Sequence, residues 1–250
     1  MRLTKYSWLP LLVAAIGACQ EDSSINTSTT GQGGSMTRFA ISNNYLYVVN
    51  HAQINIFHIQ GTTFQKVGDV DVSTGLETIF ARGEYLYLGA VDAMYIYSLA
   101  NPEVPAFVFR YSHIVACDPV VVQGNRAYVT LRNGSFCNRG SNALEIIDIS
   151  NPTAPQLIGN YPMQSPHGLA VDNNLLFLCE GENGLKVYDI TNELQIELVV
   201  QIPEIYAYDV VARNGLVTVT GEDGVFQYRY NLGTGILEML SKIPVSRFEL

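Results

Sequence analysis

The sequence lacks the short motifs that usually identify an enzyme active site. It contains no G-x-S-x-G nucleophile elbow, no H-E-x-x-H zinc motif, no P-loop, no C-x-x-C pair and no Asp-rich calcium loop. Only four histidines are present, and His51, His58 and His113 do not have the spacing of metal ligands. The common hydrolases, kinases and zinc enzymes that these motifs mark are therefore not indicated.

Basic residues and long apolar runs are also scarce. The chain holds 14 Lys and Arg against 23 Asp and Glu, a net charge of −9, and no basic cluster. An acidic chain repels phosphate backbones, so we expect no nucleic-acid partner. After residue 18 no apolar run is long enough to span a bilayer, so we expect any membrane attachment to be through the N-terminus only.

The N-terminus has the pattern of an export signal. Arg2 and Lys5 precede an apolar stretch from Leu9 to Ile16 that is too short to cross a bilayer, which predicts a signal peptide over residues 1–18. The residues Ile16-Gly17-Ala18-Cys19 resemble the lipobox of bacterial lipoproteins. The resemblance implies that Cys19 becomes the lipidated N-terminus of the mature chain. An ordinary secretory signal followed by an incidental cysteine is the alternative.

Residues 19–35 are rich in Ser, Thr, Asn and Gly and have almost no side chain to bury, which predicts a flexible tether. Its acidic start, Gln20-Glu21-Asp22, resembles the surface-export signal of Bacteroidetes lipoproteins. We therefore expect an outer-membrane lipoprotein displayed on the cell surface, with a periplasm-facing lipoprotein as the alternative. Residues 36–250 remain for a single domain, which is ample length for one core.

A pattern of four short strands recurs five times in this domain. The second strand of each repeat begins at Tyr45, Tyr85, Arg126, Leu175 and Gly215, so the starts are 40, 41, 49 and 40 residues apart. The segments favour Val, Ile, Tyr and Phe, and turns such as Glu182-Asn183-Gly184 and Glu222-Asp223-Gly224 separate them. Four antiparallel strands every forty residues are typical of a propeller blade. The sequence thus predicts an all-β fold, a five-bladed β-propeller.

The third repeat contains the fullest motif, LEIIDISNPTAPQLIG from Leu144 to Gly159. This motif resembles the LVIVD-repeat family of bacterial surface β-propellers, and the resemblance covers residues 37 to about 243. It implies a propeller and an envelope location, but no defined enzymatic activity. The first and fifth repeats depart from the motif, with His58 and Arg229 where Asp148 and Asp189 stand. Because these two aspartates precede turns, we expect their carboxylates to accept backbone N–H groups there.

The 49-residue spacing marks an insertion of about nine residues in the third repeat, between Leu131 and Asn142. In a propeller this loop lies on the face where the channel opens, and loops that break a repeat there often bind partners. Cys117 and Cys137 would lie on that face of the same blade. In an exported protein we predict a disulfide between them, with free thiols as the alternative. Cys179 follows a strand, and we expect it to be buried.

Two groups of residues on this face are candidates for a site. Glu77, Asp118 and His167 each precede the first strand of a repeat and would surround the channel mouth. They could hold a divalent metal or serve as the acid/base set of a hydrolase or lyase, although carboxylates at a channel rim are usually only hydrated. The second group is aromatic and polar and suits protein or glycan recognition. Its members are Tyr111, Arg132, Asn133, Phe136, Arg139, Tyr206 and Tyr208.

We favour the second group and assign no cofactor. The sequence is best interpreted as an envelope-anchored binding or scaffolding module with a protein or glycan partner. The alternative is an enzyme that uses Glu77, Asp118 and His167.

Overall fold

The computed structural model describes residues 34–72, 75–112, 119–133 and 142–245, and its regular structure there consists of β-strands. Within these ranges no helix has the length and apolar character needed to cross a membrane. Several predictions lie outside the described residues. They concern the signal peptide, Cys19, nearly all of the tether, Asp118, Phe136, Arg139 and the pair Cys117 and Cys137.

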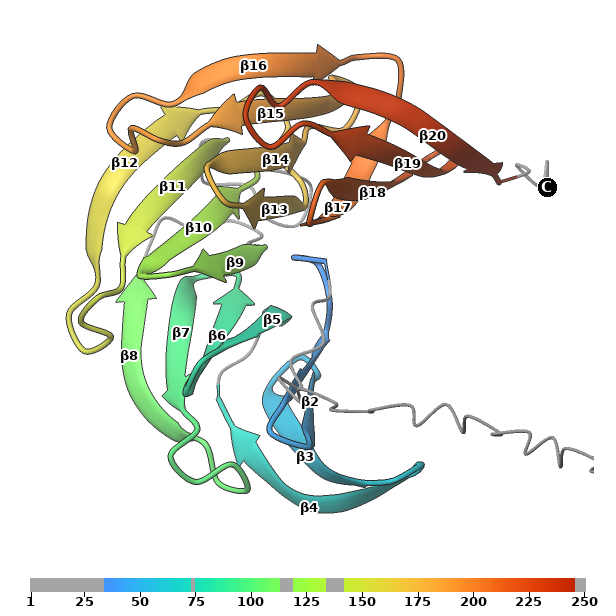
Figure 1. The fold of residues 1–250 in the computed structure, drawn as a ribbon. Helices are drawn as coiled ribbons and strands as arrows, with labels where there is room; N and C mark the ends of the chain where they lie inside the picture. Colours follow the sequence, from blue (N-terminus) through green and yellow to red (C-terminus); the bar gives the residue numbers. More distant parts are fainter. Residues whose placement is uncertain (1–33, 73–74, 113–118, 134–141, 246–250) are drawn as a thin grey trace, which may run out of the picture.

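Twenty strands form five antiparallel sheets of four strands each, which confirms the five-bladed propeller (Figure 1). Blade 1 contains β1 (Phe39–Ser42), β2 (Tyr45–Val49), β3 (Gln53–Gln60) and β4 (Thr63–Asp71). Blade 2 contains β5 (Leu76–Arg82), β6 (Tyr85–Ala90), β7 (Ala93–Ser98) and β8 (Ala106–Ser112). Blade 3 contains β9 (Val120–Gln123), β10 (Arg126–Leu131), β11 (Ala143–Asp148) and β12 (Gln156–Pro162). Blade 4 contains β13 (Leu169–Asp172), β14 (Leu175–Cys179), β15 (Leu185–Asp189) and β16 (Glu197–Ile202). Blade 5 contains β17 (Ala207–Arg213), β18 (Leu216–Gly221), β19 (Gly224–Tyr230) and β20 (Leu237–Pro244).

Neighbouring blades pack face to face through four hydrophobic clusters, one for each successive pair from blade 1 to blade 5. The middle blades are covered on both faces, so β6 is buried at five consecutive positions, Leu86–Ala90. The end blades bury alternate residues only, as β2 and β18 show. No cluster among the described residues joins blade 5 to blade 1. Accordingly Phe39 in β1 and Leu216 in β18 are 51% and 45% exposed.

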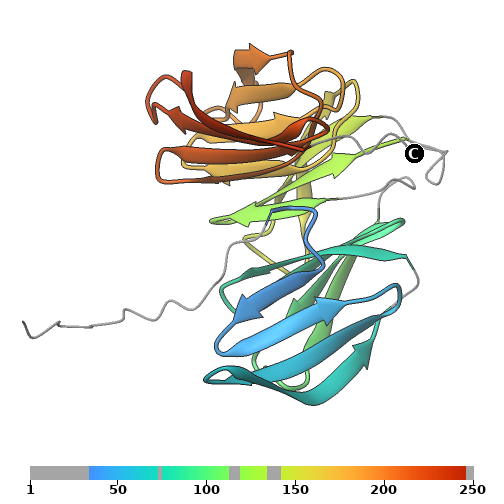
Figure 2. The same ribbon diagram turned by 90° about the vertical axis from the view of Figure 1, so that its right-hand side faces the viewer.

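Gly34 and Ser35 connect blade 1 to blades 4 and 5, because they precede β1 and reach across the channel (Figure 2). The Ser35 hydroxyl accepts the Leu169 N–H at 2.7 Å and donates to the Asp209 carboxylate at 3.2 Å. A Cβ at Gly34 or at Gly168 would lie about 2 Å from an Asp209 oxygen, so both positions require glycine. We call this contact the Ser35 clasp. The two residues that we expected at the end of the tether therefore belong to the domain.

The turns between third and fourth strands are shaped as the motif predicts. Asp148 Oδ1 accepts the Ser150 N–H at 2.8 Å, and Asp189 Oδ1 accepts the Thr191 N–H at 2.7 Å. The bond from Ser150 lowers the pKa of Asp148, and the bonds from Thr191 lower the pKa of Asp189. Both carboxylates thus have the structural role expected of them.

The same turns also join adjacent blades. In blade 1 the Tyr47 hydroxyl donates to the Pro102 carbonyl of blade 2 at 3.0 Å, and in blade 3 the Arg126 guanidinium donates to the Glu193 carboxylate of blade 4 at 2.6 Å. Gly159 of the motif lies against this junction, because a Cβ there would be 2.7 Å from the Tyr161 ring and 3.1 Å from the Glu193 carbonyl. The repeated turn is therefore a joint between blades.

Candidate functional site

The best-defined polar site lies at the channel mouth, on the face where the sequence places the binding residues. His167 lies two residues before β13, Arg132 immediately follows β10, and Tyr206 and Tyr208 stand at the start of β17. The His167 ring centroid lies 6.4 Å from that of Tyr206 and 6.2 Å from that of Tyr208, and the two tyrosine rings are 5.1 Å apart. We call these four residues the mouth cluster. Three elements from blades 3, 4 and 5 bring it together.

Hydrogen bonds fix the protonation state of His167 within this cluster. Its Nδ1 lies 2.7 Å from the Ser165 carbonyl, so Nδ1 carries the hydrogen and donates. Its Nε2 lies 3.0 Å from an Arg132 guanidinium nitrogen, so Nε2 accepts. Burial lowers the pKa of His167, the hydrogen bond to Ser165 partly offsets this, and the Arg132 charge lowers the pKa by more than Glu180 raises it. The imidazole is therefore neutral and holds Arg132 in place.

Glu77 belongs to the surroundings of the same arginine. Burial raises the pKa of Glu77, while the positive charges of Arg38 and Arg132 and the nearby His51 lower it. The positively charged Arg132 thus lies near both Glu77 and His167. Both ring nitrogens of His167 already have hydrogen-bond partners. Across the described residues no group of three His, Cys, Asp or Glu side chains could hold a metal. Metal or acid/base use of Glu77, Asp118 and His167 stays a prediction, since Asp118 lies outside the described residues.

The base of the insertion is anchored on blade 3. The Asn133 N–H donates to the Asn142 side-chain oxygen at 2.8 Å, and the Asn142 amide donates to the Gln164 carbonyl. Asn133 is therefore fixed at the mouth. Tyr111 differs, because it packs half-buried against the core between blades 2 and 3, where burial raises its pKa to about 12. Its ring contributes to packing more than to an open surface.

A buried ion pair lies behind the mouth cluster, and sequence reasoning did not identify it. The fully buried Glu180 accepts the Gln164 N–H at 2.8 Å and the Lys186 ammonium group. In the repeat alignment Glu180 occupies the position of Ala90 and Leu131, so a charged residue at a core position was the available signal. The pair orders the segment that carries Ser165 and His167. Cys179, immediately before it, is a buried free cysteine, as expected.

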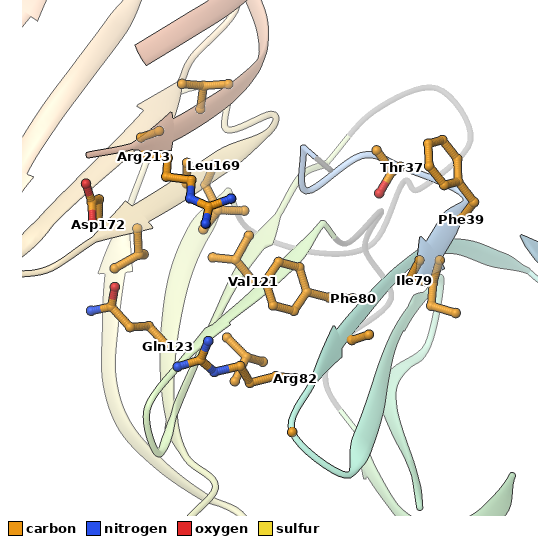
Figure 3. Close-up of a pocket in the computed structure, with 18 of the residues that line it drawn as sticks. Thr37, Phe39, Ile79, Phe80, Arg82, Val121, Gln123, Leu169, Asp172 and Arg213 are labelled. Atoms are coloured by element: carbon orange, nitrogen blue, oxygen red, sulfur yellow. The ribbon is translucent and has the colours of Figure 1, made fainter. Parts of the chain in front are cut away.

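The first strands of the five blades line a central cavity of about 650 Å³ that is open to solvent (Figure 3). Its accessible lining is more polar than apolar, and Phe39 and Phe80 supply apolar surface to it. Toward the end away from the mouth cluster it carries Arg82, Gln123 and Arg213. The repeat predicts a channel lined by the first strands, but no sequence motif marks the arginines at this end of it.

Comparisons with known proteins agree with this fold. A family model described as the LVIVD repeat matches residues 116–162, which is blade 3 with the residues just before it. No curated protein matches the chain. Among solved structures, a functionally unknown protein from Desulfotomaculum acetoxidans has a TM-score of 0.68 at 12% identity, over 83% of this chain and 69% of that one.

Two further structures show the same likeness. A computationally designed protein, Ika8, has a TM-score of 0.60 at 15% identity, over 80% of this chain and 59% of its own. Hsv2p of Kluyveromyces lactis has a TM-score of 0.54 at 14% identity, over 78% of this chain and 58% of its own. The chain therefore spans about three fifths of the length of these two proteins. At such identities the likeness concerns the fold, and residues 116–162 are an LVIVD repeat within a five-bladed β-propeller.

Proposed function

We propose that this protein is a binding module of the cell envelope, whose recognition surface for a protein or glycan partner is the mouth cluster. The observation that carries the proposal is the joint placement of Tyr206, Tyr208 and Arg132 around the neutral His167. Two tyrosine rings with an adjacent guanidinium provide contact area at low entropic cost together with directed hydrogen-bond donors.

The surroundings of the cluster support recognition rather than catalysis. Arg132 is held by His167, so its orientation is set before a partner arrives, which reduces the entropy lost on binding. His167 uses one ring nitrogen on Ser165 and the other on Arg132, so neither is free to move a proton to or from a substrate. Tyr208 is 38% exposed and can meet a partner at the surface.

Attachment to the envelope is the second part of the proposal, and the lipobox-like sequence ending at Cys19 supports it. We expect the full chain to incorporate an alkynyl palmitate analogue in bacterial cells and the Cys19→Ser variant to incorporate none. Protease treatment of intact cells then distinguishes surface display from a periplasm-facing anchor. Equal labelling of both variants would contradict lipidation at Cys19.

The recognition surface is tested by partner capture. The purified full chain and a Tyr206→Ala/Tyr208→Ala variant are immobilised and presented with envelope extract and with a glycan array. We expect a retained protein or glycan whose binding falls at least about tenfold in the variant, as for loss of interface aromatic residues.

The matched control is Phe64→Ala/Phe107→Ala, which removes two aromatic side chains that are each 59% exposed on the outer strands β4 and β8. It should bind as the wild type does. Equal retention by the mouth variant and the control variant, with unchanged melting temperatures, would show that the mouth cluster is not the recognition surface.

A further inference from the structure

We propose that the central cavity is a second site, separate from the mouth cluster, which binds a small organic anion with an apolar body. The cavity holds about 650 Å³, within the range of pockets that take ligands of drug size. It runs along the first strands, from Thr37 near the mouth to the turns at the other end. The proposal does not depend on the function assigned to the mouth.

Two arginines give the cavity its charge. Arg82 at the end of β5 and Arg213 at the end of β17 extend toward the cavity from blades 2 and 5 (Figure 3). In the described part of the chain neither guanidinium has a hydrogen-bond or ion-pair partner. Arg110 and Arg126, by contrast, each bind a carboxylate at 2.6 Å. Asp172 is the one acidic residue among the described residues that line the cavity, so the two arginines outnumber it and the lining carries a net positive charge that favours an anion.

The other polar groups at this end already have partners within the protein. Gln123 exchanges two hydrogen bonds with the Asn173 backbone, at 2.6 and 3.1 Å. Asp172 accepts the Asn214 N–H at 2.9 Å and the Tyr230 hydroxyl. These bonds fix the turns of blades 3, 4 and 5 around the cavity. Arg82 and Arg213 are thus the charged groups at this end whose donors remain for a ligand.

The wall defines the rest of the ligand. Phe39, which is 51% exposed, and the partly exposed Phe80 both line the cavity (Figure 3). Their rings are the apolar surface that a ligand can reach, because Val121 and Leu169 behind them are buried. A ligand with an aliphatic or aromatic body would pack against this wall. A carboxylate or phosphate on the same ligand would bind the two guanidinium groups. Arginine binds either anion through paired N–H donors.

The test uses a fluorescent anion and its neutral analogue. 1-Anilinonaphthalene-8-sulfonate and N-phenyl-1-naphthylamine have the same aromatic body, and only the first carries a sulfonate. We expect the sulfonate dye to bind the full chain more tightly. Arg82→Gln and Arg213→Gln should each weaken its binding about tenfold, as for one lost charge-assisted hydrogen bond, and should leave the neutral dye within about twofold.

The control variant is Arg229→Gln, which removes an exposed arginine whose guanidinium lies 3.5 Å from Glu238 on the outer part of blade 5. It should not alter either dye. Because Arg82 and Arg213 are exposed and unpaired, both variants should melt as the wild type does, so a lost dye signal cannot be attributed to unfolding.

Competition identifies the anionic group. Decanoate and decyl phosphate should displace the sulfonate dye, and decanol should not. The anion that displaces the dye at the lower concentration shows whether the site prefers a carboxylate or a phosphate. Displacement by decanol as strong as by the two anions would overturn the proposal. Unchanged sulfonate binding in the Arg82→Gln/Arg213→Gln double variant would also overturn it.

Discussion

The Ser35 clasp should carry a large share of the stability of the open ring, and Ser35→Ala tests this. The hydroxyl is in a residue that is 1% exposed, and it satisfies both the Leu169 N–H and the Asp209 carboxylate. Its removal leaves the buried N–H without that acceptor, which costs about 1–3 kcal/mol, and takes one donor from the carboxylate, which costs about 1.5–3 kcal/mol.

The two costs should not add fully, because the backbone N–H groups of Val210, Ser35 and Met36 still bind Asp209. We therefore expect the free energy of unfolding to fall by about 2–4 kcal/mol. In a domain of this size that corresponds to a fall in Tm of roughly 5–12 °C.

The assay is urea unfolding followed by far-UV circular dichroism and tyrosine fluorescence, because the only tryptophan, Trp8, lies in the predicted signal peptide. The control is Ser241→Ala on the exposed strand β20, which should change stability by less than about 0.5 kcal/mol. If Ser35→Ala lost no more stability than this control, the contact across the channel would not hold the blades together.

Three further variants test the packing around the clasp and the mouth. In Gly168→Ala the new Cβ would lie 2.0 Å from Asp209 Oδ1 and 2.8 Å from Asp209 Cα. We therefore expect the free energy of unfolding, measured in urea, to fall by about 1–3 kcal/mol or more. An unchanged free energy of unfolding would contradict this close approach. Burial raises the pKa of Asp209 above 3.8, despite the N–H groups that lower it. Asp209 therefore contributes most to stability below pH 3.8, and its contribution declines as the pH rises through the raised pKa. Between pH 3 and pH 6 the stability of Asp209→Asn should therefore rise relative to wild type, and a constant difference would refute the sign. Lys186→Met leaves Glu180 buried without its cation and should lower the free energy of unfolding by about 3–5 kcal/mol. The double variant Lys186→Met/Glu180→Gln should recover most of this loss. Equal losses in the single and double variants would argue against the ion pair.

The architecture was predictable because it repeats. Alternating apolar residues at a forty-residue period predict strands of known order, and Gly184 and Gly224 indeed have positive φ values of 82° and 137°. The role of Asp148 and Asp189 followed from local geometry, since each binds a backbone N–H only two residues away. Local and repeated features are therefore accessible from one sequence.

Contacts between distant residues were not predictable in the same way. Ser35 lies in a polar run that resembles a tether, and its partners Leu169 and Asp209 are 134 and 174 residues away. Its burial depends on glycine at two positions, Gly34 and Gly168, and no local pattern links these.

For the candidate sites too, the face on which a residue lies was predictable, and its side-chain contacts were not. Aligned repeats placed His167 and Tyr208 on one face, and the structure brings both together with Arg132 and Tyr206. That Arg132 would bind His167 could not be expected, because side-chain directions depend on the packing of blades 3 and 4.

The central claim is that a partner meets the protein at the mouth cluster, and site-specific photo-crosslinking tests it most directly. A benzoylphenylalanine placed at Tyr208 of the full chain, irradiated in envelope extract, should give a discrete adduct. The same group at Phe64, on the outer strand of blade 1 and 59% exposed, should give none. Adduct formation at Phe64 alone, or equally at both positions, would contradict the mouth as the recognition surface.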